Sequence, residues 1–332
     1  MWIIDMKKQS FVFAGLITVI AFAIGATVGS SYILKKHEDH PLTNPEKSLE
    51  YTFINPLYEQ VENKPLLTRE VEELKSAIES ATTEAVSEKI IDYGSVYYRD
   101  LNNGPWFSVG DEHSFKPASL FKVPIMIGFF KIAETNPEIL EKKVTYSTPY
   151  ENVAQHLVDS STTTIEVGKT YTINELIEYM IIYSDNLAAY LLLENIDPLI
   201  VVQVFEDLGI PSKDDTETLE GFGPRTYASY LRILYNSTYL NPEYSERALE
   251  LLSRSTFKHG MRSVLIPGVK ASLKYGIGIE PSGKKQLHEC GIIYWQEYRP
   301  HVLCIMTTGN DYEQMATYIT GVTQLVQAAL LK

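Results

Sequence analysis

The sequence is poor in cysteine and in basic residues, and each shortage excludes a class of protein. Cys290 and Cys304 are its only cysteines, which excludes a scaffold of several disulfides and a zinc module built from Cys-x-x-Cys pairs. Lysine and arginine total 29 against 42 aspartates and glutamates, a net charge of −13. Binding to nucleic acid phosphates needs a basic surface, so nucleic acid is not an expected partner. A hydrophobic content of 45% in 332 residues nevertheless predicts a folded core.

Charge is also missing from a stretch near the N-terminus. Residues 9–34 carry no charge, and the apolar segment 11–34 is long enough to cross a bilayer as a helix. We expect a transmembrane anchor at 11–34 after a short N-terminal head, 1–10. A cleavable signal peptide ending near Ala21-Phe22-Ala23 is the alternative. The expected location is the cell membrane, single-pass, with the body on the extracytoplasmic side, or secretion if the segment is cleaved.

The rest of the chain predicts a linker and one large domain. Residues 35–66 combine proline, asparagine and charge with little periodicity, which is typical of a linker. In the predicted domain, 67–332, a helix and two strands precede a long helical insert, and three strands and a helix follow it. Parallel β-α-β alternation is absent. The pattern favours an α+β fold, with an antiparallel five-stranded sheet flanked by helices and an additional all-α lobe.

Three Ser-x-x-Lys sequences occur, but only one opens an apolar helix. The pairs Ser255/Lys258 and Ser282/Lys285 lie in polar surroundings, whereas Ser119 and Lys122 begin the run SLFKVPIMIGFFKIA. Residues three apart share one helix face, so the Lys122 amine can reach the Ser119 hydroxyl. Burial disfavours the ammonium form of lysine, which would leave Lys122 basic enough to take the Ser119 proton.

Two further motifs follow in order along the chain. Ser184-Asp185-Asn186 lies between two helical segments, and Lys274-Tyr275-Gly276 lies in an expected strand. Ser-x-x-Lys, Ser-Asp-Asn and Lys-x-Gly in this order resemble the penicillin-recognising serine hydrolases, closest to the class A β-lactamase catalytic domain. The resemblance covers about residues 67–332. It implies a reaction through an acyl-enzyme, with no cofactor and no metal.

The resemblance also implies catalytic roles, residue by residue. Ser119 would be the nucleophile, Lys122 would activate it, and Ser184 would relay a proton to the leaving nitrogen. The backbone N–H groups of Ser119 and Ile277 would form the oxyanion hole. Each such donor contributes about 3 kcal/mol of transition-state stabilisation in enzymes of this kind.

Substrate binding is assigned in the same way. Asn186 would hydrogen-bond the amide side chain of the substrate, and Lys274 would hold its carboxylate while its charge helps to keep Lys122 neutral. Gly276 would let the strand approach the substrate closely. The family usually has threonine or serine where this chain has Tyr275, and a phenol is too long for that position, which weakens the prediction of carboxylate recognition.

A second departure concerns the hydrolysis of the acyl-enzyme. Class A enzymes carry an E-x-x-L-N loop whose glutamate activates water, and the corresponding segment here, GIPSKDDTETLEGFG, lacks it. Of its two glutamates, Glu217 and Glu220, the order of the chain favours Glu220 as a deacylation base. A solvated loop charge is the alternative interpretation of Glu220. Fast turnover of β-lactams is therefore not implied.

Histidines and cysteines near the end of the chain raise the question of a metal site. His301 and Cys304 are an odd number of residues apart on one expected strand, so their side chains point to opposite faces and cannot bind one ion. We therefore expect no metal at His288, Cys290, His301 and Cys304. A disulfide between the two cysteines is an open alternative.

The sequence thus predicts an active-site serine hydrolase of class A β-lactamase type that hydrolyses β-lactams. Two alternatives stay open. A D,D-peptidase acting on peptidoglycan stem peptides is favoured by the missing glutamate loop, and a non-catalytic penicillin-binding sensor or wall-binding module is favoured by Tyr275. The expected partners are a β-lactam or a D-Ala-D-Ala-type peptide, and the membrane. The protein is expected to be a monomer.

Overall fold

The structure is a computed structural model, and it describes residues 51–55, 68–101, 104–110, 113–150, 163–208, 221–280, 282–295 and 300–331. The chain separates into two units, 1–50 and 51–332, and all described residues lie in the second. The predicted head and membrane segment, most of the predicted linker and Glu220 lie outside the described residues.

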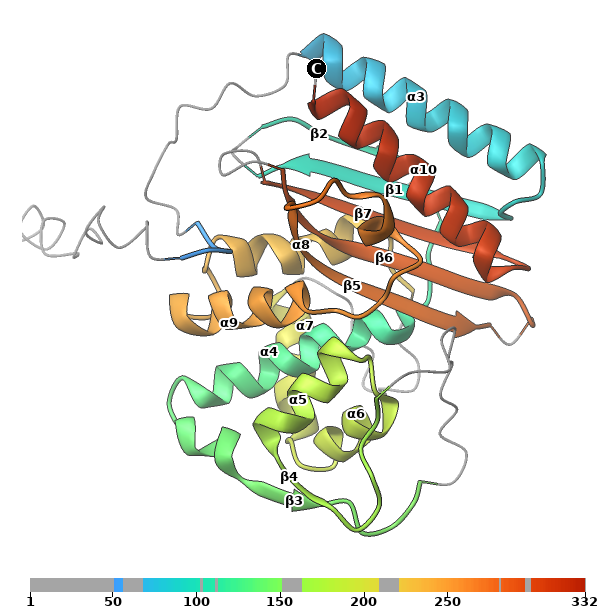
Figure 1. Cartoon of the computed structure of the whole chain (residues 1–332). Helices are drawn as coiled ribbons and strands as arrows, with labels where there is room; N and C mark the ends of the chain where they lie inside the picture. The colour runs from blue at the N-terminus through green and yellow to red at the C-terminus, as the bar shows by residue number, and fades with distance from the viewer. Residues whose placement is uncertain are drawn as a thin grey trace, which may run out of the picture. The chain divides into compact units, whose positions relative to one another are not determined.

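Five antiparallel strands form the central sheet, in the order β2-β1-β7-β6-β5. Their bounds are β1 Tyr93–Asp100, β2 Trp106–Val109, β5 Lys270–Ile279, β6 Lys285–Tyr294 and β7 Pro300–Gly309. The predicted antiparallel five-stranded sheet is therefore confirmed. Its last three strands follow one another in the chain, and β5 forms an edge of the sheet (Figure 1).

Helices cover both faces of this sheet. Helices α3 (Thr68–Ser87) and α10 (Tyr312–Leu330) lie on one face, and α8 (Pro224–Tyr235) packs on the other (Figure 1). Side chains therefore alternate along β7 between two cores: Leu303 belongs to the core under α3 and α10, whereas Val302 belongs to the core under α8. Burial on both faces explains why these strands read as continuous apolar runs.

The helical insert forms a lobe on the α8 side of the sheet (Figure 1). Its helices are α4 Lys122–Ala133, α5 Ile173–Ile182, α6 Asn186–Leu193 and α7 Pro198–Asp207, and α9 (Pro242–Ser253) packs between the lobe and β5. Helix α4 is buried along most of its length and contacts the other helices of the lobe, as its apolar sequence predicts. A 3-10 helix, Pro137–Glu141, follows α4.

The prediction of an all-α lobe was wrong in one respect. Strands β3 (Lys143–Thr145) and β4 (Thr170–Thr172) pair there as a two-stranded antiparallel sheet. Each strand has only three residues, which is too short to produce a readable alternation in the sequence. The pair is held by cross-strand contacts instead, including a 2.8 Å hydrogen bond between the hydroxyls of Thr145 and Thr170.

Within the described residues, no single helix is long and apolar enough to cross a membrane. Helices α6 and α7 reach that length and composition only as a pair, and the chain bends by 103° between them. Their apolar side chains, such as Leu192 and Phe205, are buried in the core of the domain. The predicted segment 11–34 lies outside the described residues.

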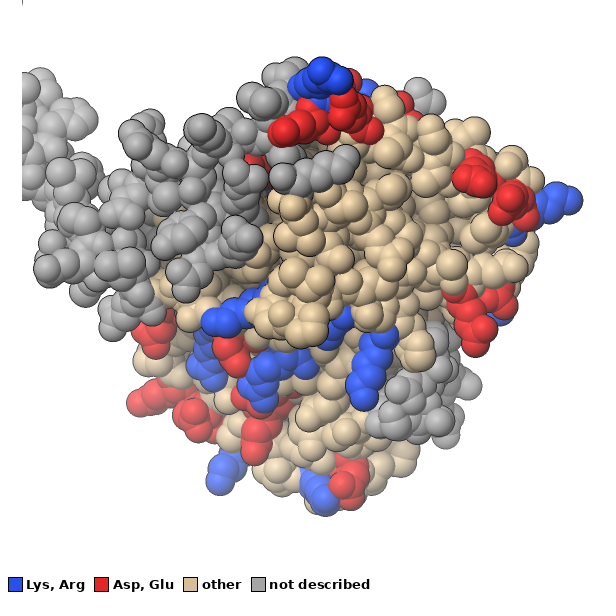
Figure 2. Space-filling view, turned by 45° about the horizontal axis from the view of Figure 1, so that its top comes forward, with Lys and Arg blue, Asp and Glu red and all other residues tan. Residues whose placement is uncertain are grey.

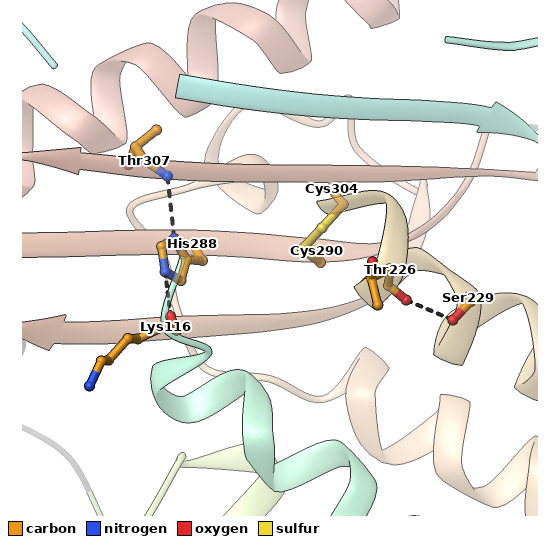
Figure 3. Close-up of a disulfide and its surroundings, with 7 residues drawn as sticks. All are labelled: Lys116, Thr226, Ser229, His288, Cys290, Cys304 and Thr307. Atoms are coloured by element: carbon orange, nitrogen blue, oxygen red, sulfur yellow. Dashed lines mark hydrogen bonds between the residues drawn. A yellow bond between two sulfur atoms is a disulfide. The ribbon is translucent and has the colours of Figure 1, made fainter. Parts of the chain in front are cut away.

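The two cysteines lie directly opposite each other on β6 and β7 and form the Cys290–Cys304 disulfide (Figure 3). The disulfide faces α8, in the core that also contains Val302 and Met306. His301 packs on the other face of the sheet, against Trp295 and Tyr98. Among the described residues, no group of three or more histidine, cysteine or acidic side chains is arranged to hold a metal ion.

Residues 51–55, which fall in the predicted linker, pack onto the domain. The Glu246 carboxylate of α9 accepts hydrogen bonds from three successive backbone N–H groups, those of Thr52, Phe53 and Ile54, at 2.7, 2.8 and 3.0 Å. The Tyr294 hydroxyl donates to the Phe53 carbonyl at 3.0 Å. One carboxylate thus fastens the segment that enters the domain.

Loss of the Glu246 charge should release this segment. Hydrogen bonds to charged groups contribute about 1.5–3 kcal/mol when buried, and Glu246 is only half-buried, so we expect Glu246→Gln to lower the free energy of unfolding by about 1–2 kcal/mol. Urea denaturation measures this change. Glu250→Gln on the same helix removes only a solvent-exposed ion pair with Arg254 and should change stability by less than about 0.5 kcal/mol. Equal effects of the two variants would contradict the assignment.

Charged side chains are unevenly distributed over the surface. Figure 2 shows one face on which lysines and arginines gather in a band across the middle, while aspartates and glutamates lie mostly around it. The chain as a whole carries a net charge of −13. The net charge therefore does not determine the sign of the charge that a ligand meets locally, and it does not exclude an anionic small molecule.

Candidate active site

Ser119 lies in a tight turn at the start of α4. The turn is a 3-10 helix, Ala118–Phe121, and α4 itself begins at Lys122. Ala118 has a φ of +47°, which is rare for a residue with a Cβ. The edge strand β5 lies directly against this turn, because a Cβ on Gly276 would lie only 3.0 Å from the Pro117 carbonyl oxygen. Glycine at 276 is thus required for the close packing of β5 against the turn that carries Ser119.

The Lys122 side chain is buried and surrounded by acceptors. Its Nζ lies 3.1 Å from Ser119 Oγ, 2.6 Å from Asn186 Oδ1 and 3.2 Å from Ser184 Oγ, and it also donates to the Ser184 carbonyl oxygen. A carbonyl and an amide oxygen can only accept hydrogen bonds. In the neutral amine these two oxygens take both N–H groups, which leaves the nitrogen lone pair for the Ser119 hydroxyl.

Burial favours this neutral form. It lowers the pKa of Lys122 from 10.5 to about 7, and the nearby negative charge of Asp185 opposes the shift only in part. Near neutral pH a large fraction of Lys122 is therefore deprotonated. A lysine with this pKa can act as a general base under physiological conditions.

The Ser184 turn is shaped by Asp185, to which the sequence analysis assigned no role. Ser184 has a φ of +57°, and the next residue caps α6: Asp185 Oδ1 accepts from Leu187 N–H at 2.9 Å. Asp185 Oδ2 accepts from Ile165 N–H at 2.9 Å and from the Thr164 hydroxyl at 3.0 Å. The fully buried carboxylate thus fixes the turn on both sides. The Ser-Asp-Asn motif itself was the signal, since aspartate before a helix is a preferred cap.

Lys274 faces the same turn from β5. Its fully buried Nζ donates to Ser184 Oγ at 2.8 Å and to the Tyr275 carbonyl oxygen at 2.9 Å. Burial, and then the like charge of Lys122, lower the pKa of Lys274 well below its usual value. Because Lys274 donates to Ser184 Oγ, the proton of the Ser184 hydroxyl is left for another acceptor. The structure therefore brings Ser119, Lys122, Ser184, Asn186 and Lys274 into one cluster.

The remaining predicted residues of β5 divide between the two faces of the strand. The Tyr275 ring stacks on Phe257 with centroids 4.4 Å apart, and both belong to the core on the α10 side of the sheet. Lys274 Nζ lies 4.3 Å from the centroid of the same ring. Ile277 also packs in that core and pairs with Leu287 on β6. Its N–H as an oxyanion donor stays a prediction, and Glu220 lies outside the described residues.

This cluster joins three segments that lie far apart in the sequence, in the order that the motifs predicted. A model described as the beta-lactamase enzyme family matches residues 76–330. The chain belongs to the beta-lactamase enzyme family. The predicted membership of the penicillin-recognising serine hydrolases is thereby confirmed.

Solved structures of similar fold agree with this family. PBP-A has a TM-score of 0.63 at 20% identity, covering 81% of this chain and 98% of its own. A mutant of PBP-A, solved as an acyl-enzyme complex with penicillin G, has a TM-score of 0.64 at 20% identity and covers 81% and 99%. The class A β-lactamase from Mycobacterium abscessus has a TM-score of 0.64 at 19% identity and covers 77% and 100%. At this identity the likeness shows the fold. No curated protein matches the chain.

A base with a pKa of about 7 makes the reactivity of this beta-lactamase-family site depend on pH. Below that pH the protonated Lys122 cannot accept the Ser119 proton. We expect the second-order rate constant for labelling by a fluorescent penicillin to rise about tenfold per pH unit up to about pH 7 and then to level off. Labelling between about pH 5 and pH 9 measures this profile. A profile that stays flat across this range would contradict the assignment of Lys122 as the base.

Proposed function

We propose that the chain is a serine hydrolase that reacts with β-lactams through an acyl-enzyme on Ser119. The observation that carries the proposal is the position of the Lys122 amine, buried, 3.1 Å from the hydroxyl of Ser119 and with both N–H groups engaged elsewhere. A serine hydroxyl needs such a base to become a nucleophile at neutral pH.

In the proposed acylation, Ser119 Oγ attacks the amide carbonyl carbon and passes its proton to Lys122 Nζ. The C–N bond of the lactam then breaks as the leaving nitrogen takes a proton from the Ser184 hydroxyl, which recovers a proton from Lys122. Ser184 Oγ is suited to this relay because it lies 3.2 Å from Lys122 Nζ and 2.8 Å from Lys274 Nζ. The N–H groups of Ser119 and Ile277 would stabilise the oxyanion.

Release of the acyl group requires a base that activates water. The chain lacks the E-x-x-L-N motif, and no glutamate of the described residues is hydrogen-bonded to Ser119 or Lys122. We therefore infer a long-lived acyl-enzyme and slow turnover of β-lactams. The same feature favours the second candidate, a D,D-peptidase that forms its acyl-enzyme with a peptidoglycan stem peptide.

The location that fits this function is outside the cytoplasm. The uncharged segment 11–34 would anchor the protein in the membrane, with the serine hydrolase domain on the extracytoplasmic side. The Cys290–Cys304 disulfide supports this location, since disulfides persist in oxidising compartments. β-Lactams and peptidoglycan precursors would be met there.

Intact-mass measurement after incubation with penicillin tests the proposal. We expect one covalent adduct per chain, persisting for minutes or longer, and no adduct in Ser119→Ala. Ser282→Ala serves as the matched control, because Ser282 begins a second Ser-x-x-Lys sequence in an exposed turn, and it should be labelled like the wild type.

Three other outcomes would overturn parts of the proposal. The absence of any adduct in the wild type would favour the non-catalytic sensor. Continuous hydrolysis of a chromogenic cephalosporin after the initial burst would contradict slow turnover. Release of D-alanine from a D-Ala-D-Ala peptide at a rate that exceeds β-lactam turnover would assign the chain to the second candidate, the D,D-peptidase.

A further inference from the structure

His288 is a fully buried histidine beside the segment that leads to Ser119. It lies on β6, on the face of the sheet that carries the disulfide (Figure 3). Its Nε2 is 3.0 Å from the carbonyl oxygen of Lys116, three residues before Ser119. Its Nδ1 is 3.3 Å from the backbone nitrogen of Thr307 on β7. The ring thus bridges the middle of the sheet and the approach to the nucleophile.

These two contacts fix the tautomer of the ring. The Thr307 N–H can only donate, so Nδ1 of His288 accepts and carries no proton. Nε2 then carries the proton and donates it to the Lys116 carbonyl. Burial lowers the pKa of His288 to about 4, so the ring is neutral near pH 7. The sequence analysis considered His288 only as a metal ligand, and its position here is a different one.

The register of the sheet explains how the ring reaches so far. His288 lies directly opposite Gly276 on the edge strand β5. Because position 276 has no side chain, β5 packs closely against the turn, and the imidazole reaches past it to Lys116. The Phe115 ring packs edge-on against the imidazole, with centroids 5.4 Å apart.

The segment that receives this contact is conformationally unusual. Ala118, two residues after Lys116, has a φ of +47°. A residue with a Cβ keeps such a conformation only when its surroundings impose it. One anchor before it is the pairing of Phe115 with Phe222, through two backbone hydrogen bonds of 3.2 and 2.9 Å. The His288 contact is the next anchor along the chain towards Ser119.

We propose that His288 is a positioning residue, whose Nε2–H holds the Lys116 carbonyl and so fixes the turn that presents Ser119 to Lys122. Its catalytic consequence rests on the proposed function, whereas its hold on the turn does not. A displacement of a nucleophile by about 1 Å can slow a reaction about 100-fold. The contact therefore matters for the rate although His288 touches no reacting atom.

Two substitutions separate the two hydrogen bonds of the ring. The amide of His288→Asn ends near the position of Nδ1, so it can serve Thr307 but cannot reach Lys116. His288→Gln is longer by one methylene and can donate to the Lys116 carbonyl from the position of Nε2. Rescue by glutamine over asparagine is thus expected if the Lys116 contact is the one that matters.

Hydrogen exchange measures the hold on the turn without any substrate. The Leu120 N–H donates to the Pro117 carbonyl at 3.0 Å and closes the turn. We expect this amide to exchange at least about tenfold faster in His288→Asn and within about threefold of the wild-type rate in His288→Gln. Similar exchange in the two variants, fast or slow, would overturn the proposal.

Acylation kinetics measure the catalytic consequence. We expect the first-order acylation constant at saturating penicillin to fall about 10- to 100-fold in His288→Asn and to recover in His288→Gln. The dissociation constant of the initial complex should stay within about threefold. Unchanged acylation in His288→Asn, despite faster exchange at Leu120, would overturn the positioning role.

His301→Asn is the matched control for loss of a buried histidine. His301 packs on the opposite face of the sheet, where it accepts a hydrogen bond from the Trp295 indole at 2.9 Å. It should lower the thermal midpoint while leaving the acylation constant and the Leu120 exchange rate unchanged. If acylation instead follows the thermal midpoint across all three variants, the proposal is overturned. A wild type that penicillin does not label defeats the proposed function alone, because the exchange rates still decide whether His288 holds the turn.

Discussion

The site depends on two lysine amines buried in one small cluster. Lysine is almost never fully buried unless it is paired, yet the hydrogen bonds of Lys122 and Lys274 go to uncharged oxygen atoms of hydroxyl, carbonyl and amide groups. Desolvation and the mutual repulsion of the two amines then remove the proton that water would leave on each. The fold thus holds a strong base ready beside a serine.

The two parts of the domain each supply half of this arrangement. The helical lobe contributes the turn at Ser119, the start of α4 and the cap of α6, whereas the sheet contributes only its edge strand. An edge strand has one free side, and here the turn at Ser119 packs against β5, next to Gly276. The close approach is possible because the strand lacks a side chain at that point.

The sequence predicted the order and type of the elements well, because most helices and strands are long and strongly periodic. The motif order also indicated which residues gather in the cluster. Features carried by few residues were missed: strands β3 and β4, with three residues each, and the 3-10 turn before Lys122. The role of His288 could not be predicted either, since its partner Lys116 lies 172 residues away and only the register of β5 against β6 brings the two together.

Long separations along the chain have a consequence for biosynthesis. Hydrogen bonds from Lys122 to Ser184, from Lys274 to Ser184 and from His288 to Lys116 span 62, 90 and 172 residues. Contacts of this kind form late, after the loops between them have closed. A nascent chain that has emerged only as far as α9 carries the serine and its lysine but neither β5 nor β6. The serine therefore becomes reactive only when the final hairpins have formed, so partly synthesised chains are chemically silent.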